Sequence, residues 1–192
     1  MKKLMIIIFA VISIAMAPNL QSGAKLSDAA IERTNHQVRY SSGYIKLEYP
    51  NGDVPEGTGV CTDVVVRSYR NGLGVDLQKL IHEDMKANFD KYPSKRIWGA
   101  TRPDNNIDHR RTQNQECFFK RMGGKLPITH DPEDYKPGDL VYWGDIATGH
   151  VGIVVDKFVD GRPMVVHNIG GGPQCEDFLF ESRITGHYRW FP

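Results

Sequence analysis

Apolar residues recur at helical spacing in the first two thirds of the chain. The clearest case follows Asp76, where one stripe is formed by Leu77, Leu80, Ile81, Met85 and Phe89. This is the pattern of a helix that packs one face against a core, and it predicts a helix from Asp76 to Phe89. Capping residues and an Asn-Gly pair mark the ends of further helices. We expect these at Ser27 to about Gln37, at Cys61 to Arg70, and from Asp108 to about Met122 with Cys117 and Phe118 buried.

Short β-branched runs replace this pattern beyond Gly123-Gly124. They predict strands at Leu140 to Trp143, His150 to Asp156, Met164 to Ile169 and roughly Ile184 to Phe191. Asp160-Gly161 lies between the second and third runs and predicts a hairpin turn. Helices followed by an antiparallel sheet indicate an α+β fold.

Three stretches before that sheet lack a clear helical pattern. Tyr40 to Tyr49 is aromatic and partly alternating, which favours an extended segment. Asn51 to Gly59 contains three glycines and a proline, and Tyr92 to Ile107 is rich in Pro, Gly and Asn. These compositions predict an irregular loop and a surface loop, respectively.

The N-terminus has the pattern of a secretory leader. Lys2-Lys3 precede an apolar run from Leu4 to Ala17, which is shorter than the roughly 20 residues that span a bilayer. Small residues offer two cleavage positions, after Ala17 and after Ala24, and Pro18 disfavours the first. We therefore predict a signal peptide at 1–24 and one domain at 25–192, located in the periplasm or secreted. The alternative is an uncleaved N-terminal anchor.

Composition narrows the function classes. The 192 residues include 24 Lys+Arg and 23 Asp+Glu, with 40% hydrophobic residues. These values disfavour wholesale disorder and a nucleic-acid binder that works by bulk charge, and they do not predict an oligomeric state. Export favours disulfides, but the chain has three cysteines, so at least one is left over. Cys117 and Cys175 could form a disulfide and leave Cys61 free.

The residue types around Cys61 indicate nucleophilic chemistry. Cys61 lies where a glycine-rich loop meets a predicted helix N-terminus, a position that lowers the pKa of a thiol. His150 begins a predicted strand and His167 lies on the next one, so a hairpin could bring the two rings together. A cysteine, a histidine and a polar residue that orients the imidazole form the triad of a cysteine hydrolase. Asn168 is the rival orienting residue, because adjacent strand residues point to opposite faces.

Three segments carry a resemblance to known proteins. Gly59-Val60-Cys61-Thr62-Asp63, Pro137 to Val141 and Gly149 to Val154 resemble the motifs of NlpC-type papain-like cell-wall cysteine peptidases. With Arg102-Pro103-Asp104, Asn106 to Arg111 and Val166 to Gly170, the chain from about Ala29 to Tyr188 resembles a bacterial family known as domain of unknown function 1287. The resemblance implies a papain-like fold with Cys61, His150 and His167 as the triad.

The same resemblance suggests how an oxyanion would be held. Tyr49, twelve residues before Cys61, resembles the tyrosine that supplies a donor in NlpC-type enzymes, and Tyr44 is its competitor. The chain departs from the best-known members at Val60 and at Thr62-Asp63, and it carries a long insert between the nucleophile and His150. These departures concern the substrate more than the catalytic residues.

Charged residues in the insert add candidate binding groups. They are Arg102, Asp104, Asp108, His109, Arg110 and Arg111. Paired arginines could bind a substrate carboxylate, as in acidic stem peptides, although a solvated surface or an internal salt-bridge network is the ordinary interpretation. Asp63 could bind a substrate amine or simply order its loop. Neither His82-Glu83-Asp84 nor Asp108-His109 has the spacing of a zinc site, so we predict neither metal nor other cofactor.

Together these features predict an exported cysteine hydrolase. It would cleave an amide bond in peptidoglycan stem peptides through a thioester on Cys61. The alternatives are an acyl or peptidyl transferase, an amidase with a substrate outside the wall, and an inactive wall-binding module. The expected partner is a peptidoglycan peptide or another amide, with no nucleic acid and no membrane after leader cleavage.

Overall fold

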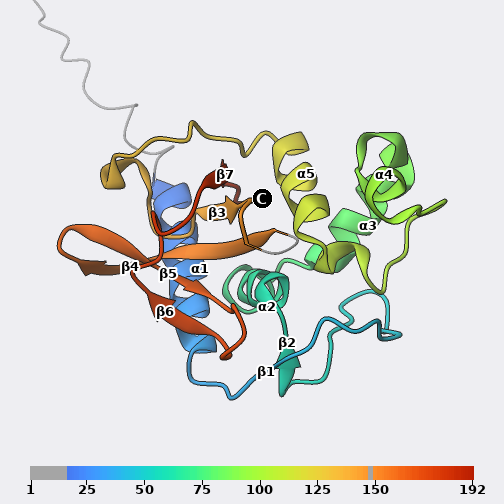
Figure 1. Cartoon of the computed structure of the whole chain (residues 1–192), viewed down its shortest axis with the longest axis horizontal. Coiled ribbons are helices and arrows are strands. Elements are labelled where there is room, and N and C mark those ends of the chain that lie inside the picture. The colour runs from blue at the N-terminus through green and yellow to red at the C-terminus, as the bar shows by residue number, and fades with distance from the viewer. Residues whose placement is uncertain (1–16, 147–148) are drawn as a thin grey trace, which may run out of the picture.

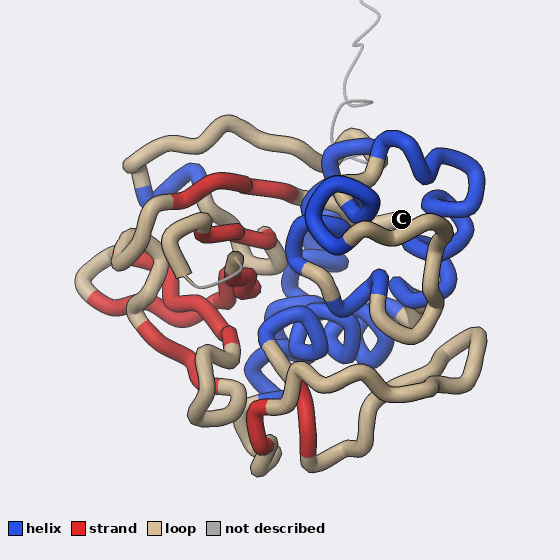
Figure 2. The backbone as a smooth tube through the Cα atoms, turned by 45° about the vertical axis from the view of Figure 1, so that its right-hand side comes forward, coloured by secondary structure: helices blue, strands red, loops and turns tan. Residues whose placement is uncertain are grey.

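The computed structural model describes residues 17–146 and 149–192, and a mixed helix and sheet fold results (Figures 1 and 2). The helices are α1 (Ala17–Arg33), α2 (Cys61–Leu73), α3 (Leu77–Asn88), α4 (Ser94–Trp98) and α5 (Thr112–Arg121), with short 3-10 turns η1 (Phe89–Lys91), η2 (Asp108–Arg110) and η3 (Pro132–Asp134). The strands are β1 (Arg39–Tyr40), β2 (Thr58–Gly59), β3 (Leu140–Trp143), β4 (His150–Val159), β5 (Arg162–His167), β6 (Gln174–Glu176) and β7 (Ile184–Tyr188). Helices α2 to α5 lie on one side of the molecule and the larger sheet on the other (Figure 2).

The predicted helix at Cys61 is confirmed, but it ends three residues later than expected. Asn71 and Gly72 remain helical, and Gly74 ends the helix in the left-handed conformation with φ 67°. Gly72 stays within α2 because α1 packs closely there. A Cβ at this position would lie 2.7 Å from the Lys25 carbonyl oxygen.

The helix after Asp76 is confirmed as α3, and the Asp76 side chain caps it by accepting from the Lys79 N–H. The single helix predicted from Asp108 to Met122 is wrong. The chain makes the turn η2, extends at Arg111, and only then forms α5. The Tyr92 to Ile107 loop also contains a short helix, α4.

The larger sheet has the strand order β6-β5-β4-β3-β7, and every pair in it is antiparallel. Four of its strands match the predicted runs, and the hairpin at Asp160-Gly161 is confirmed, with φ of 49° and 79°. The sequence pattern missed β6. Of the stretch from Tyr40 to Tyr49, only Tyr40 belongs to a strand, as the last residue of β1. This strand pairs in parallel with β2, which lies just before Cys61.

Hydrophobic residues cover both faces of this sheet. Leu140, Val151 and Ile153 face α1, α2 and α5, and α1 crosses behind β4 in Figure 1. On the opposite face, Trp143, Val154 and Val165 pack against Tyr135 and against the segment after β6 that contains Phe178 and Leu179. The strand ends near α2 are therefore held from both sides.

The predicted leader can be described only in part. Residues 1–16 lie outside the described residues, and α1 begins at Ala17. The preferred cleavage position, after Ala24, falls inside α1, whereas a cut after Ala17 would remove only the first described residue of this helix. Gly23 packs against the Pro137 carbonyl and Phe191, so this part of α1 contacts the body of the protein. No helix within residues 17–146 or 149–192 is long and apolar enough to span a membrane.

The three cysteines are free, so the disulfide between Cys117 and Cys175 is not formed in this structure. Cys117 lies on α5, where its Sγ contacts the Lys91 carbonyl, while Cys175 lies on β6. In Figure 1, α5 lies above α2 and β6 lies to its left. Cys117 is also only half-buried, although it was expected in the core.

Candidate active site

Cys61 is the first residue of α2, directly after the β1–β2 pair. Its sulfur is close to three backbone N–H groups, those of Cys61, Thr62 and Val151, each of which favours the thiolate. Val151 is the second residue of β4. The sulfur therefore lies against the start of the strand that carries His150.

Burial raises the pKa of the Cys61 thiol by more than these three N–H groups lower it. Cys61 is only 4% exposed, and loss of hydration, with a smaller contribution from Asp63, raises the pKa of the thiol to about 11. The prediction of a lowered pKa is therefore wrong for this structure. The helix terminus was recognised correctly, but the sequence did not reveal how completely the thiol is removed from water.

Two histidines and a carboxylate form a hydrogen-bonded chain. His150 Nε2 lies 2.7 Å from His167 Nδ1, and His167 Nε2 lies 2.8 Å from a carboxylate oxygen of Glu176. The three residues come from the adjacent strands β4, β5 and β6. Trp143 and Phe178 pack against both histidine rings and exclude water from them.

Both imidazoles are less basic than a free histidine. Burial, with a smaller contribution from His167, lowers the pKa of His150 to about 3. Burial also lowers the pKa of His167, although its hydrogen bond to Glu176 opposes the shift. At neutral pH the resting site therefore contains a thiol and a neutral imidazole rather than a thiolate and an imidazolium.

The alternative between His167 and Asn168 is decided by the geometry of β5. His167 points towards His150. Asn168 instead donates to the Gly59 carbonyl at 3.4 Å and accepts from the Gly170 N–H at 3.1 Å. Asn168 thus orders the loop before the nucleophile, and His167 is the neighbour that orients His150.

A cavity of about 350 Å³ opens on Cys61. Gly149 lines it with φ 97°, and a Cβ there would lie 2.9 Å from the Thr112 hydroxyl. Glycine therefore both permits this backbone conformation and leaves room in front of β4. Its other lining residues are Tyr40, Ser42, Tyr44, Val60, Trp98, Ile107, Arg110, Arg111, Thr112 and Gln113.

The structure does not bring Tyr49 to this cavity. Its ring packs edge-on against His82 of α3, with centroids 5.1 Å apart. Tyr44 does line the cavity, but its hydroxyl donates to Asp104 and accepts from Asn106. Tyr40 lines the cavity as well, and its pKa is raised by burial and then by the nearby Cys61. Tyr40 is therefore the tyrosine best placed near the sulfur.

Asp63 and Arg110 form a buried, two-point ion pair. Arg110 Nε and Nη2 each lie 2.9 Å from one Asp63 oxygen, and Asp63 also accepts from the Val60 N–H. Arg110 donates further to the carbonyls of Ser41 and Gly43. With these contacts, Asp63 orders the loop instead of facing a substrate amine.

The other candidates in the insert are divided between core and surface. Asp108 and His109 are buried, and burial raises the pKa of Asp108 to about 6 and lowers that of His109 to about 3. Asp104, Arg102 and Arg111 line a second cavity, of about 680 Å³. Arg102 makes no hydrogen bond or ion pair with another described residue, so its guanidinium is available to a ligand.

The two cavities adjoin, because both are lined by Tyr44, Trp98, Ile107 and Arg111. Arg111 lies over the Trp98 ring, 4.1 Å from its centroid, and pairs with Asp108. We call the combined space the Cys61 groove. It offers an aromatic surface and two arginines to a chain that extends away from the sulfur.

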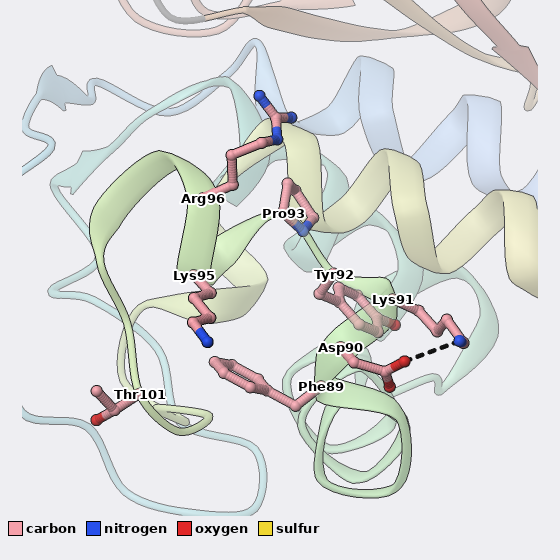
Figure 3. A pocket seen from close by; sticks show the side chains of 8 residues that line it. All are labelled: Phe89, Asp90, Lys91, Tyr92, Pro93, Lys95, Arg96 and Thr101. Carbon is pink, nitrogen blue, oxygen red and sulfur yellow. Dashed lines mark ion pairs between the residues drawn. The ribbon is translucent and has the colours of Figure 1, made fainter.

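A larger cavity, of about 880 Å³, lies apart from Cys61 between η1 and α4 (Figure 3). It is lined by Phe89, Asp90, Lys91, Tyr92, Pro93, Lys95, Arg96 and Thr101, and Asp90 pairs with Lys91. It contains neither Cys61 nor any residue of the histidine chain. Size alone therefore does not identify the reactive site.

Among residues 17–146 and 149–192, no group of three histidine, cysteine or acidic residues is arranged to hold a metal ion. His150 Nε2 and His167 Nδ1 are hydrogen-bonded to each other, and His167 Nε2 is hydrogen-bonded to Glu176.

Sequence reasoning missed three residues of this site. Glu176 lies on a strand too short to show a periodic pattern, and Trp98 lies in a stretch expected to be a loop. Tyr40 was visible as an aromatic residue in a segment expected to be extended. Pairing of β1 with Gly59 brings it close to Cys61, and this parallel pairing of two-residue strands leaves no signal in the sequence.

Comparison with known proteins identifies a family over most of the chain. The family described as Domain of unknown function (DUF1287) matches residues 27–190. The chain is also similar to the uncharacterized protein YijF of Escherichia coli (strain K12), with 49% identity over 168 residues that cover 86% of this chain and 80% of YijF. The family match begins within α1 and ends just beyond β7. The chain therefore belongs to the DUF1287 family.

Proposed function

We propose that this protein is an exported, papain-like cysteine hydrolase that cleaves an amide bond in peptidoglycan peptides. The observation that supports it most is the chain from His150 through His167 to Glu176, which starts on the strand whose next residue, Val151, places its N–H at the sulfur of Cys61. A nucleophile, a base and a residue that orients the base are the parts that such a reaction requires. The test is digestion of peptidoglycan by the wild type and by Cys61→Ala.

In the proposed mechanism, His150 acts as a general base. Its Nδ1 takes the proton of Cys61 as the sulfur attacks the amide carbon, and the carbonyl oxygen becomes an oxyanion. The Cys61 N–H and the Tyr40 hydroxyl are the donors best placed to stabilise that oxyanion. His150 then protonates the leaving amine, and the acyl group remains on sulfur as a thioester. Water, deprotonated by His150, releases the acid and restores the thiol.

The Cys61 groove would hold the rest of the substrate. Trp98 offers an apolar face, and Arg102 and Arg111 offer cations at a distance from the sulfur. Peptidoglycan stem peptides carry carboxylates, which guanidinium groups bind well. This arrangement favours an acidic peptide over a neutral one.

Replacement of Arg102 by alanine tests this binding role. Because Arg102 has no described partner in the protein, we expect unchanged stability. The KM for muropeptides should rise about 5- to 10-fold at nearly constant kcat, the loss of one charged hydrogen bond. Arg96→Ala is the matched control, since Arg96 lines the separate cavity of Figure 3. Equal KM values for the two variants would exclude Arg102 from substrate binding.

The resting site can be tested without a substrate. With a thiol pKa of about 11 and a His150 pKa of about 3, the thiolate fraction increases tenfold per pH unit up to pH 11. Alkylation of Cys61 by iodoacetamide should therefore accelerate about tenfold per unit between pH 6 and 9. Peptide mapping separates Cys61 from Cys117 and Cys175. A rate that is flat across this range would reveal a preformed thiolate and contradict the neutral pair.

The raised pKa of Cys61 also favours a second candidate function, that of a binding module without turnover. Such a protein would use the Cys61 groove to hold a wall peptide and would leave it intact. Sedimentation with purified peptidoglycan measures that binding. If the wild type binds but releases no new peptide, and Cys61→Ala binds equally, the binding module is the better description.

A further inference from the structure

Glu176 is the outermost member of the histidine chain. It ends β6, and the pairing of Val165 with Glu176 and of His167 with Gln174 places it diagonally across from His167 on the same face of the sheet. One carboxylate oxygen of Glu176 lies 2.8 Å from His167 Nε2. The adjacent Asp177 is turned elsewhere and pairs with Arg162. Glu176 is thus the carboxylate aimed at the site.

The chemistry of a carboxylate fixes where the protons sit. An ionised carboxylate only accepts hydrogen bonds, so His167 Nε2 must carry a proton. A neutral imidazole has one such proton, which leaves His167 Nδ1 as an acceptor. His150 Nε2, 2.7 Å away, must then be the donor in that contact. His150 Nδ1 is left bare, as a base requires.

The two histidines alone would not impose this order. With both protons moved, His167 Nδ1–H would donate to His150 Nε2, and His150 would carry its own proton on Nδ1. The hydrogen bond between the rings would be equally good, but His150 could not accept a proton at Nδ1. Only Glu176, the partner of His167 Nε2, distinguishes the two orders of protons.

We propose that Glu176 is a positioning residue that sets the tautomers of His167 and His150 and so keeps His150 competent as a base. This inference rests on the proposed hydrolase function. The Glu176 side chain is 42% exposed, so water screens its charge. It therefore acts mainly by accepting one directed hydrogen bond and less by long-range attraction.

Glu176→Gln is the informative variant. The amide has the same shape as the carboxylate but can donate to His167 Nε2, which favours the reversed proton order. With a muropeptide mixture as substrate, we expect kcat to fall about 100- to 1,000-fold while KM changes less than about threefold. Glu176→Asp keeps an accepting carboxylate and should retain more activity than Glu176→Gln. Asp177→Asn is the control, because it removes the neighbouring carboxylate and leaves this chain intact.

A spectroscopic measurement separates this inference from the function itself. Histidine ¹⁵N NMR distinguishes a bare ring nitrogen from one that carries a proton, and it needs no substrate. In the wild type at pH 7 we expect Nδ1 bare in both His150 and His167. In Glu176→Gln we expect the proton on Nδ1 instead, with urea unfolding at the same midpoint.

The outcomes are distinct. Unchanged tautomers in Glu176→Gln would overturn the inference, whatever the activity. Unchanged kcat in that variant with active wild type would overturn it as well. If the wild type cleaves no amide but the tautomers reverse as expected, the role of Glu176 in setting them stands and the hydrolase proposal fails.

Discussion

Replacement of His150 by alanine is expected to lower kcat on muropeptides about 10³- to 10⁴-fold, because loss of a general base in such a site costs that much. His150 is the proposed base because it begins the strand whose next residue, Val151, places its N–H at the sulfur, and because its ring is hydrogen-bonded to His167. Without it, no base takes the thiol proton during the attack. The attack then depends on the small fraction of thiolate that is present in solution.

Two controls keep this result interpretable. His36→Ala removes a histidine at the surface that pairs with Glu32, and it should leave kcat unchanged. His150 is buried, so urea unfolding must show that His150→Ala remains folded under assay conditions. A folded His150→Ala protein with kcat within threefold of the wild type would exclude His150 as the base.

The second large effect is on stability. Arg110→Ala should reduce the free energy of unfolding by about 3–5 kcal/mol, because it leaves the Asp63 carboxylate buried without its cation. Asp63 and Arg110 are 47 residues apart in sequence and both side chains are almost completely buried. Arg110 also holds the carbonyls of Ser41 and Gly43. Its removal should therefore loosen the loop that brings Tyr40 to Cys61.

Arg183→Ala is the matched control for Arg110→Ala. Arg183 Nε lies 2.9 Å from Asp145 Oδ1, the same contact as in the buried pair, but both side chains are largely exposed. A surface pair of this kind contributes at most about 1 kcal/mol. Chemical denaturation of both variants measures the difference. Equal losses in the free energy of unfolding would show that burial does not increase the contribution of the Asp63–Arg110 pair to stability.

Local patterns predicted the parts of the fold that depend on neighbours in sequence. The stripe from Leu77 to Phe89 specified α3, and the β-branched runs specified β3, β4 and β5. Where tertiary contacts determine the local structure, the sequence pattern predicted the wrong element. Asp108 was expected to cap a helix, but it is buried and accepts from the Asp104 N–H. The extended residue Arg111 then separates the turn η2 from α5.

In the candidate site too, local sequence patterns predicted some residues and tertiary contacts determined the others. Cys61 and His150 could be proposed because each begins a recognisable helix or strand, and His167 because it lies on the strand that a hairpin places next to His150. The choice between His167 and Asn168 required the register of β5, and Glu176 required a strand of three residues. Tyr49 was favoured over Tyr44 by its spacing from Cys61. Spacing along a loop does not determine which tyrosine folds back, and the β1–β2 pair selects Tyr40.

The pKa of Cys61 shows why position and environment must be considered together. A helix N-terminus stabilises a thiolate, and the structure does provide three N–H groups near the sulfur. Their effect is smaller than the loss of water around a side chain that is almost completely covered. A substrate that enters the Cys61 groove would therefore meet a thiol, and the proton would leave only during attack.

The most direct measurement is mass spectrometry of peptidoglycan fragments after incubation with wild-type protein and with Cys61→Ala at equal concentration. The proposed hydrolase releases, with the wild type, shorter peptides that have gained one water across a cleaved amide, and Cys61→Ala yields none above the level without protein. If Cys61→Ala releases the same fragments at the wild-type rate, or if the wild type releases none, Cys61 is not the nucleophile of a wall-peptide hydrolase.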